Sequence, residues 1–119
     1  MIEQQFGRTL SVGVEEELWI LDAETLELAP AVGKLVAGVQ GRTLPGILKT
    51  ELHASVVELT NEIAESPDEA VDRIAELRRA AAEVAHAEGL SVAAAGSHPT
   101  SRPEQQEIAP DERYREFVE

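Results

Sequence analysis

Apolar and polar residues alternate along residues 10–22, near the N-terminus of the chain. This period of two is typical of a β-strand, in which successive side chains point to opposite faces. One face would carry Val12, Val14, Leu18 and Ile20, interrupted only by Glu16, and the other would carry Gly13, Glu15, Glu17 and Trp19. Residues 22–25 then predict a turn, and residues 26–29 predict a short returning strand.

The next segments give weaker patterns. Residues 31–39 keep the apolar spacing of a helix, but three glycines (Gly33, Gly38 and Gly41) weaken that interpretation. Residues 47–52 and 55–60 are rich in apolar and β-branched residues. They predict either two extended strands or one bent strand.

The clearest predicted element is a long helix over residues 67–88. Ser66 is a suitable N-cap, Pro67 suits the first helical position, and Glu69 completes a capping box. Gly89 is a typical helix terminator. The expected apolar stripe consists of Val71, Ile74, Leu77, Ala81, Val84 and Ala85.

After this helix, residues 90–95 predict a buried strand of small residues, and residues 96–106 predict a polar loop. Residues 110–117 predict the start of another helix, and the sequence ends within it. No segment is rich enough in Gly, Ser or Pro to separate two domains. We therefore expect residues 1–119 to form one unit, and the end within a helix predicts that it is truncated.

Composition narrows the possible functions. The formal charge is −13, with 23 acidic and 10 basic residues, which argues against a nucleic-acid partner because phosphate binding needs a basic surface. The chain has no cysteine, so disulfides, thiolate metal sites and a thiol nucleophile are excluded. The N-terminus lacks the pattern of a signal peptide, and no apolar stretch is long enough to span a membrane. We expect a cytoplasmic protein.

Two groups of carboxylates are candidate metal ligands. Glu15 and Glu17 would project from the same face of the first strand, where they could bind a hard divalent cation or simply face water. Glu58 lies between apolar residues, so it is expected to be partly buried and to need a partner. That partner could be Lys49 in a salt bridge. Alternatively, Glu51 and Glu58 could converge with the first pair around magnesium.

Other patterns are less informative. The sequence has no Walker-type or Gly-x-Gly-x-x-Gly phosphate loop, so any nucleotide would have to be held by metal ions and arginines. The three histidines have no ligand spacing. His86 is expected on the helix surface, and His98 lies in a loop, where either a structural turn or a functional role is open.

In order along the chain, these segments resemble the type 2 glutamate–cysteine ligase family, also called carboxylate–amine ligases. The similarity runs through Val12-Gly13-Val14-Glu15-Glu16-Glu17-Leu18, Glu51, Val57-Glu58-Leu59-Thr60, Ile74-Ala75-Glu76-Leu77-Arg78, Ala95-Gly96-Ser97-His98-Pro99 and Glu112-Arg113-Tyr114. The sequence departs from the family at Thr100, where an aromatic residue is common, and at Glu51, where Asp is common.

The resemblance implies a glutamine-synthetase-like α+β fold, an antiparallel sheet with helices packed on one face. It also implies ATP and Mg²⁺ as cofactors and amide formation through an acyl phosphate, typically between glutamate and cysteine. By similarity, Glu15, Glu17, Glu51 and Glu58 would bind magnesium, while Thr60, His98 and Arg113 are candidate substrate-binding residues. The resemblance further implies that residues 1–119 are the N-terminal portion of a single glutamine-synthetase-like catalytic domain. The longer family members supply further ligands and arginines, so this segment alone is expected to have little activity.

Two other functions remain open on sequence grounds. The chain could be a non-catalytic α+β module that acts in association, or a simple binder of divalent cations. Unpaired edges of the predicted sheet would favour a homo-oligomer.

Overall fold

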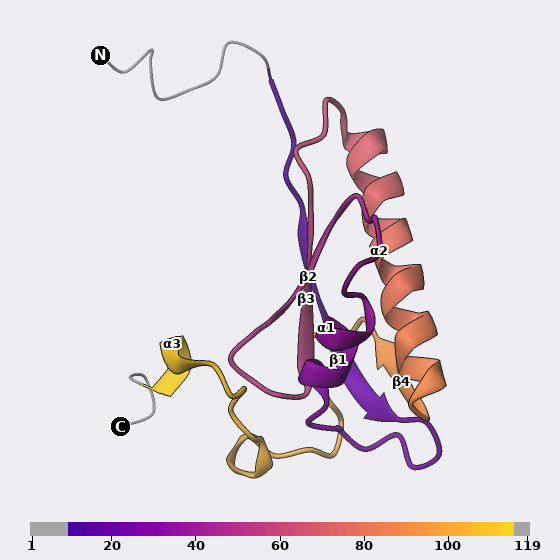
Figure 1. The fold of residues 1–119 in the computed structure, drawn as a ribbon. Helices are drawn as coiled ribbons and strands as arrows, with labels where there is room; N and C mark the ends of the chain where they lie inside the picture. The colour runs from indigo at the N-terminus through magenta and orange to yellow at the C-terminus, as the bar shows by residue number, and fades with distance from the viewer. Residues whose placement is uncertain (1–9, 116–119) are drawn as a thin grey trace, which may run out of the picture.

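The computed structural model describes residues 10–115. Their order along the chain is β1 (Glu15–Asp22), α1 (Val32–Gly38), β2 (Gly46–Thr50), β3 (Val56–Asn61), α2 (Pro67–Ala87), β4 (Leu90–Ala93), the 3-10 helix η2 (Pro103–Gln105) and α3 (Glu112–Arg115). This arrangement confirms the α+β class (Figure 1).

The four strands form one sheet in the order β2-β3-β1-β4. Every neighbouring pair is antiparallel. The two extended segments in the middle of the sequence are therefore two separate strands, β2 and β3, and not one bent strand. Their register places Lys49 opposite Glu58, and Glu58 in turn opposite Glu17 of β1.

The long helix α2 packs along one face of this sheet (Figure 1). Its start agrees with the predicted cap, because the Ser66 hydroxyl accepts the Glu69 N–H at 3.2 Å. Its end agrees as well, since Gly89 follows with a φ of 71°, in the left-handed region that glycine adopts without strain. The residues of α2 that are buried are Ala70, Ile74, Leu77, Ala80, Ala81, Val84 and Ala85.

One member of the predicted stripe was wrong. Val71 is 66% exposed, and Ala70 is fully buried instead. Successive helical residues are about 100° apart around the axis, so Val71 lies well away from the line of Ala70, Leu77 and Ala81 that faces the sheet. The larger side chain at position 71 misled a prediction based on hydrophobicity.

The ambiguous segment after the first strand is a short helix, α1. Val32 and Leu35 lie in the core, and α1 contacts both α2 and the sheet. A Cβ atom at Gly38 would overlap the Val84 side chain of α2. The glycine that weakens helix propensity therefore allows α1 to approach α2 closely.

Several boundaries differ from the predictions. The first strand begins at Glu15, and Val12 makes only an isolated bridge with Ala64. The returning strand is reduced to a single bridge between Leu21 and Leu28. β4 ends at Ala93 and is half-buried, because it lies at an edge of the sheet and not at its centre. Positions 116 and 117 of the last predicted helix lie outside the described residues.

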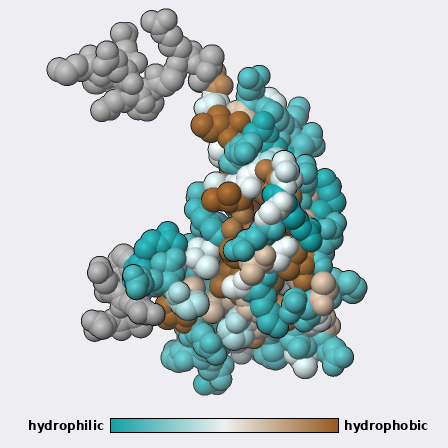
Figure 2. Space-filling model, viewed as in Figure 1, coloured by the Kyte–Doolittle hydropathy of each residue, from teal (hydrophilic) through white to brown (hydrophobic). Residues whose placement is uncertain are grey.

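Helices α1 and α2 pack on one face of the sheet, and we call the opposite face the open face. Figure 2 shows apolar patches within a largely hydrophilic surface, and exposed apolar side chains include Leu10, Ile63 and Val71. In the described part of the chain, no helix is both long and apolar enough to span a membrane. β2 and β4 are the edge strands, and association through them stays a prediction.

The packing of α2 gives a direct test of the core. We expect Leu77→Ala to lower the free energy of unfolding by about 2–5 kcal/mol, because Leu77 is fully buried and truncation leaves a cavity. Urea denaturation followed by circular dichroism measures the change. Val71→Ala on the same helix is the matched control, and its effect should stay within about 0.5 kcal/mol. Equal effects at both positions would contradict this packing.

Candidate functional site

The open face of the sheet collects the candidate residues. Leu18, Val57 and Leu59 are buried on the face that α2 covers. Alternation along each strand sends the intervening residues to the open face. From β1, β2 and β3 these are Glu15, Glu17, Trp19, Ile47, Lys49, Val56, Glu58 and Thr60. The structure therefore brings the predicted carboxylates of β1 and β3 onto one surface.

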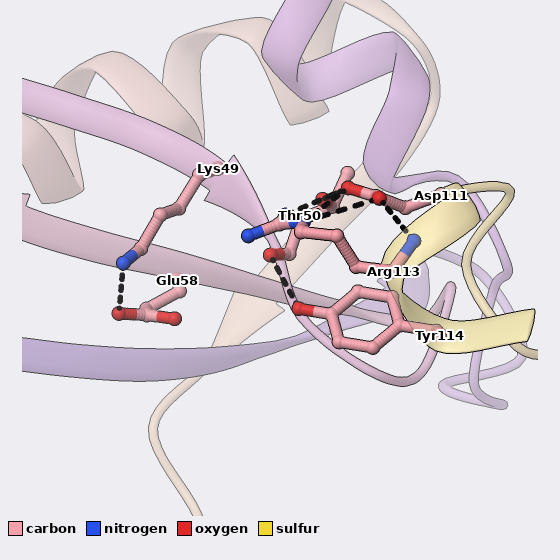
Figure 3. Close-up of polar contacts among 6 residues, drawn as sticks. All are labelled: Lys49, Thr50, Glu58, Asp111, Arg113 and Tyr114. Atoms are coloured by element: carbon pink, nitrogen blue, oxygen red, sulfur yellow. Dashed lines mark hydrogen bonds and ion pairs between the residues drawn. The ribbon is translucent and has the colours of Figure 1, made fainter. Parts of the chain in front are cut away.

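Lys49, on the edge strand β2, places a positive charge on this acidic surface. Its ammonium nitrogen is 2.9 Å from Oε1 of Glu58 and 3.8 Å from Oε1 of Glu15. Figure 3 shows the Lys49 side chain extending from β2 toward Glu58 on the neighbouring strand. Only 9% of the Glu58 side chain is exposed, against 65% for Glu15. Of the two roles open for Glu58, the salt bridge is the one present.

Each member of the Lys49–Glu58 pair favours the charged form of the other. Burial is the largest single influence and acts to raise the pKa of Glu58. The hydrogen bond and positive charge of Lys49, together with hydrogen bonds involving Glu51 and Thr60, outweigh it, so the pKa lies below its ordinary value. The hydrogen bond to Glu58 likewise raises the pKa of Lys49. Both side chains are therefore charged at neutral pH. A carboxylate buried to this extent needs such a partner.

Glu17 and Glu51 lie on a neighbouring cleft of about 530 Å³, which is also lined by Trp19, His53 and Val56. Trp19 and His53 are residues that the sequence analysis did not identify as site residues. Neither lies in a motif with recognisable spacing, and they meet only because β1 and the segment after β2 are neighbours in space. This cleft adjoins the Lys49 group, because Glu17 lies directly opposite Glu58 in the sheet and the Glu51 carboxyl lies within hydrogen-bonding reach of Glu58.

The donor chemistry of this surface suits a hard divalent cation, which prefers carboxylate oxygens. Within residues 10–115, however, no three acidic or histidine side chains are close enough together to hold a metal ion as they lie. The cation between Glu15 and Glu58 is the Lys49 ammonium. The carboxylates have the right chemistry for a divalent ion, and they lie on the same face of the sheet. To bind one, Lys49 would have to move away and the carboxylates would have to turn toward each other.

Glu16 has a different role from its two neighbours. It lies on the face covered by α2, where Arg78 donates two hydrogen bonds to its carboxylate, one of them at 2.5 Å from Nε to Oε2. This pairing explains how a glutamate can interrupt the apolar face of β1. The partner is 62 residues away in sequence, so no local pattern could have identified it.

Thr60 lies on the open face and contacts the central pair. Its hydroxyl donates to Oε1 of Glu58 at 3.3 Å, the same oxygen that Lys49 approaches. Thr60 therefore supports the orientation of Glu58. A direct contact with a substrate stays a prediction.

His98 holds a turn in place. Its Nε2 is 2.9 Å from the Leu26 carbonyl oxygen, and its Nδ1 accepts the Ser101 N–H at 3.1 Å. Leu26 has a φ of 62°, a conformation that is unfavourable for a non-glycine residue. Both ring nitrogens are thus used to fasten the loop after β4 to the turn after β1, which favours the structural role that the sequence left open.

Arg113 lies at the other end of the open face, on α3. It forms an ion pair with Asp111 at 2.6 Å, and its hydrogen bonds hold the pKa of that carboxyl down at about 2. Tyr114 donates to the Thr50 carbonyl oxygen at 3.4 Å, and Figure 3 shows these contacts joining α3 to the end of β2. Arg113 is 64% exposed, so its guanidinium remains accessible beside the site.

Comparisons with known proteins agree with the motifs on this surface. The profile of a family described as glutamate-cysteine ligase family 2 matches residues 11–119. A protein of Chloroflexus aggregans, provisionally named glutamate–cysteine ligase 2, is 42% identical over 109 residues, which cover 91% of this chain and 27% of that protein. A protein of Sorangium cellulosum with the same provisional name is 39% identical over 119 residues, covering 99% of this chain and 32% of its own length. The chain thus spans about a third or less of these relatives.

The Lys49–Glu58 pair predicts a pH-dependent stability. The folded pKa of Glu58 lies below its ordinary value of 4.5, so the stabilisation is present above that value and is lost as the pH falls through the folded pKa. We expect Glu58→Gln to cost about 1–2 kcal/mol of unfolding free energy at neutral pH. The difference from the parent chain should shrink toward zero as the pH falls below about 4.

Urea denaturation at a series of pH values measures this difference. Glu88→Gln is the matched control, since it breaks the exposed Lys34–Glu88 pair and should cost no more than about 0.5 kcal/mol. A Glu58→Gln effect that does not change with pH would rule out the ion pair as its source.

The turn held by His98 gives a second prediction. His98→Ala removes the acceptor of the Ser101 N–H, so amide hydrogen exchange at Ser101 should become about two- to twelvefold faster, as expected for loss of one hydrogen bond. His86→Ala, on the exposed side of α2, should leave that exchange unchanged. Unaltered protection of Ser101 in the His98 variant would show that the loop is held by other contacts.

Proposed function

Since this chain belongs to glutamate–cysteine ligase family 2, we propose that it is the N-terminal portion of an enzyme that joins a carboxylate to an amine. The proposed cofactors are ATP and Mg²⁺. The proposed substrates are glutamate and cysteine, with an acyl phosphate of glutamate as the intermediate. Family membership supports the ligase class. The substrates, ATP and the acyl phosphate are proposed from the resemblance to that family, and the acidic face supports a divalent cation.

The observation that carries the proposal is the shared face of Glu15, Glu17 and Glu58. These three carboxylates come from two adjacent strands, with Glu17 directly opposite Glu58, and the ammonium of Lys49 lies between Glu15 and Glu58. Phosphorylating a carboxylate with ATP brings two anionic groups together, and divalent ions reduce their repulsion and stabilise the charge of the transferring phosphoryl group. A rigid acidic surface that binds such ions is what this chemistry needs.

The residues of this chain would have defined parts in that reaction. Glu15, Glu17 and Glu58, with Glu51 from the neighbouring cleft, would hold magnesium through their carboxylate oxygens. Thr60 would orient Glu58 through the hydrogen bond between them. Arg113, accessible at the edge of the face, would attract the phosphate or carboxylate groups of the substrates. His98 would keep the loop beside the cleft in position.

The other properties proposed from the sequence accompany this function. The partners are small amino-acid substrates and not nucleic acid, in keeping with the charge of −13. The enzyme is proposed to be cytoplasmic and to take part in glutathione biosynthesis. Because the chain spans about a third or less of its relatives, the remaining groups of the active site are proposed to come from the rest of such a protein.

Trapping of the acyl phosphate tests this function. With ATP, Mg²⁺, glutamate and hydroxylamine, the complete polypeptide encoded by the reading frame should form γ-glutamyl hydroxamate and release ADP. Glu17→Gln should lower the rate at least about a hundredfold, because loss of one charge-stabilising ligand costs that much in comparable sites. Its melting temperature should stay close to that of the parent protein, since Glu17 is an exposed residue.

A conserved rate in Glu17→Gln would remove this residue from the catalytic surface. The absence of both hydroxamate and amine-dependent ADP release with a panel of amino acids would contradict the ligase assignment. Glu58→Gln separates a purely structural Glu58 from a catalytic one. Loss of activity with folding intact supports metal binding by Glu58, whereas loss of folding supports a structural role in the buried salt bridge with Lys49.

A further inference from the structure

We propose that Lys49 is an internal counter-ion that holds the place of a divalent cation between Glu15 and Glu58, so that metal binding displaces it. This inference rests on the proposed function, because that function assigns the two carboxylates to a metal site. The Lys49 ammonium would stabilise the two carboxylates when no metal is bound, and it would lower their affinity for metal.

The position of the ammonium carries the argument. Lys49 is on β2, directly opposite Glu58 on β3, and Glu58 is directly opposite Glu17 on β1. The Lys49 nitrogen is 2.9 Å from Glu58 and 3.8 Å from Glu15. An ion that bridged these two carboxylates would need the space that this nitrogen occupies.

The Lys49 ammonium and a divalent metal ion cannot both lie between Glu15 and Glu58, for reasons of charge. Glu15 and Glu58 together carry two negative charges, of which the ammonium offsets one. A divalent cation would offset both, but it could not share the position with an ammonium because like charges at this distance repel strongly. Metal binding at these carboxylates therefore requires Lys49 to withdraw.

The side chain of Lys49 can move away from Glu58 into solvent. It is 37% exposed, and a flexible four-carbon stem lets its nitrogen move into solvent at little cost. Glu58, with 9% of its side chain exposed, cannot follow it outward. Glu58 can therefore stay in place while the ammonium is exchanged for a metal ion, as reversible metal binding requires.

Metal binding to the whole 119-residue chain tests the proposal, with Mn²⁺ as the probe. Lys49→Met removes the internal cation but keeps an unbranched apolar stem of similar length to that of lysine. We expect it to bind Mn²⁺ about tenfold more tightly than the parent chain by isothermal titration calorimetry, as expected when one charge-assisted hydrogen bond no longer competes. The chain has one other lysine, Lys34, which pairs with Glu88, so Lys34→Met is the matched control and should bind Mn²⁺ like the parent.

A second measurement needs no variant and covers the case in which Lys49→Met does not fold. Titration of the parent chain with Mg²⁺ should shift the side-chain NMR resonances of Lys49 as its ammonium leaves Glu58, while those of Lys34 stay unchanged. With only two lysines in the sequence, these resonances are readily assigned.

Equal or weaker Mn²⁺ binding by Lys49→Met, or Lys49 resonances that do not respond to Mg²⁺, would overturn the proposal. The hydroxamate assay remains independent of it. An active ligase whose Lys49 is indifferent to metal would refute the counter-ion role alone, whereas an inactive protein whose Lys49→Met variant binds Mn²⁺ more tightly would refute only the ligase.

Discussion

The packing of α2 on a single face of the sheet is the constraint on which the rest of this structure depends. Leu18, Val57 and Leu59 are buried beneath it, and the period of two then fixes where every neighbouring residue points. A slip of one residue would place Glu15, Glu17 and Glu58 against the helix and expose the core residues, which is prohibitive in energy. The acidic face is therefore a direct consequence of how the core is packed.

Local patterns predicted the parts of the fold that local chemistry determines. The start of α2 follows from Ser66 and Glu69, its end from Gly89, and the acidic face of β1 from strict alternation. For Glu58 the sequence left open a salt bridge with Lys49 or convergence with the carboxylates of β1. The salt bridge is present, and Glu58 also lies opposite Glu17. The resemblance to a family supplied the fold type, since no pattern within the sequence could have given the strand order.

Contacts between residues far apart in the chain could not be predicted from the sequence patterns. Arg78 neutralises Glu16 from a position 62 residues away, and Val71 is exposed although its hydrophobicity favours burial. In the same way, Gly38 weakens the propensity of α1 yet allows its close approach to Val84. Each outcome depends on which elements become neighbours in space. Propensity and periodicity describe one element at a time and cannot contain that information.

The two ion pairs of the sheet illustrate the difference between a permanent and an exchangeable cation. Arg78 uses the fork of its guanidinium to bind both oxygens of Glu16, a geometry that is rigid and specific. Lys49 makes one contact at 2.9 Å with Glu58, through a compact charge on a flexible stem. On the covered face, where the carboxylate only has to be neutralised, the bidentate residue is the better choice. On the open face, where Glu58 is proposed to bind metal, a rigid fork would compete too well with the metal. Arginine beside Glu16 suits a permanent structural pair on the covered face. Lysine beside Glu58 suits an exchangeable pair on the open face.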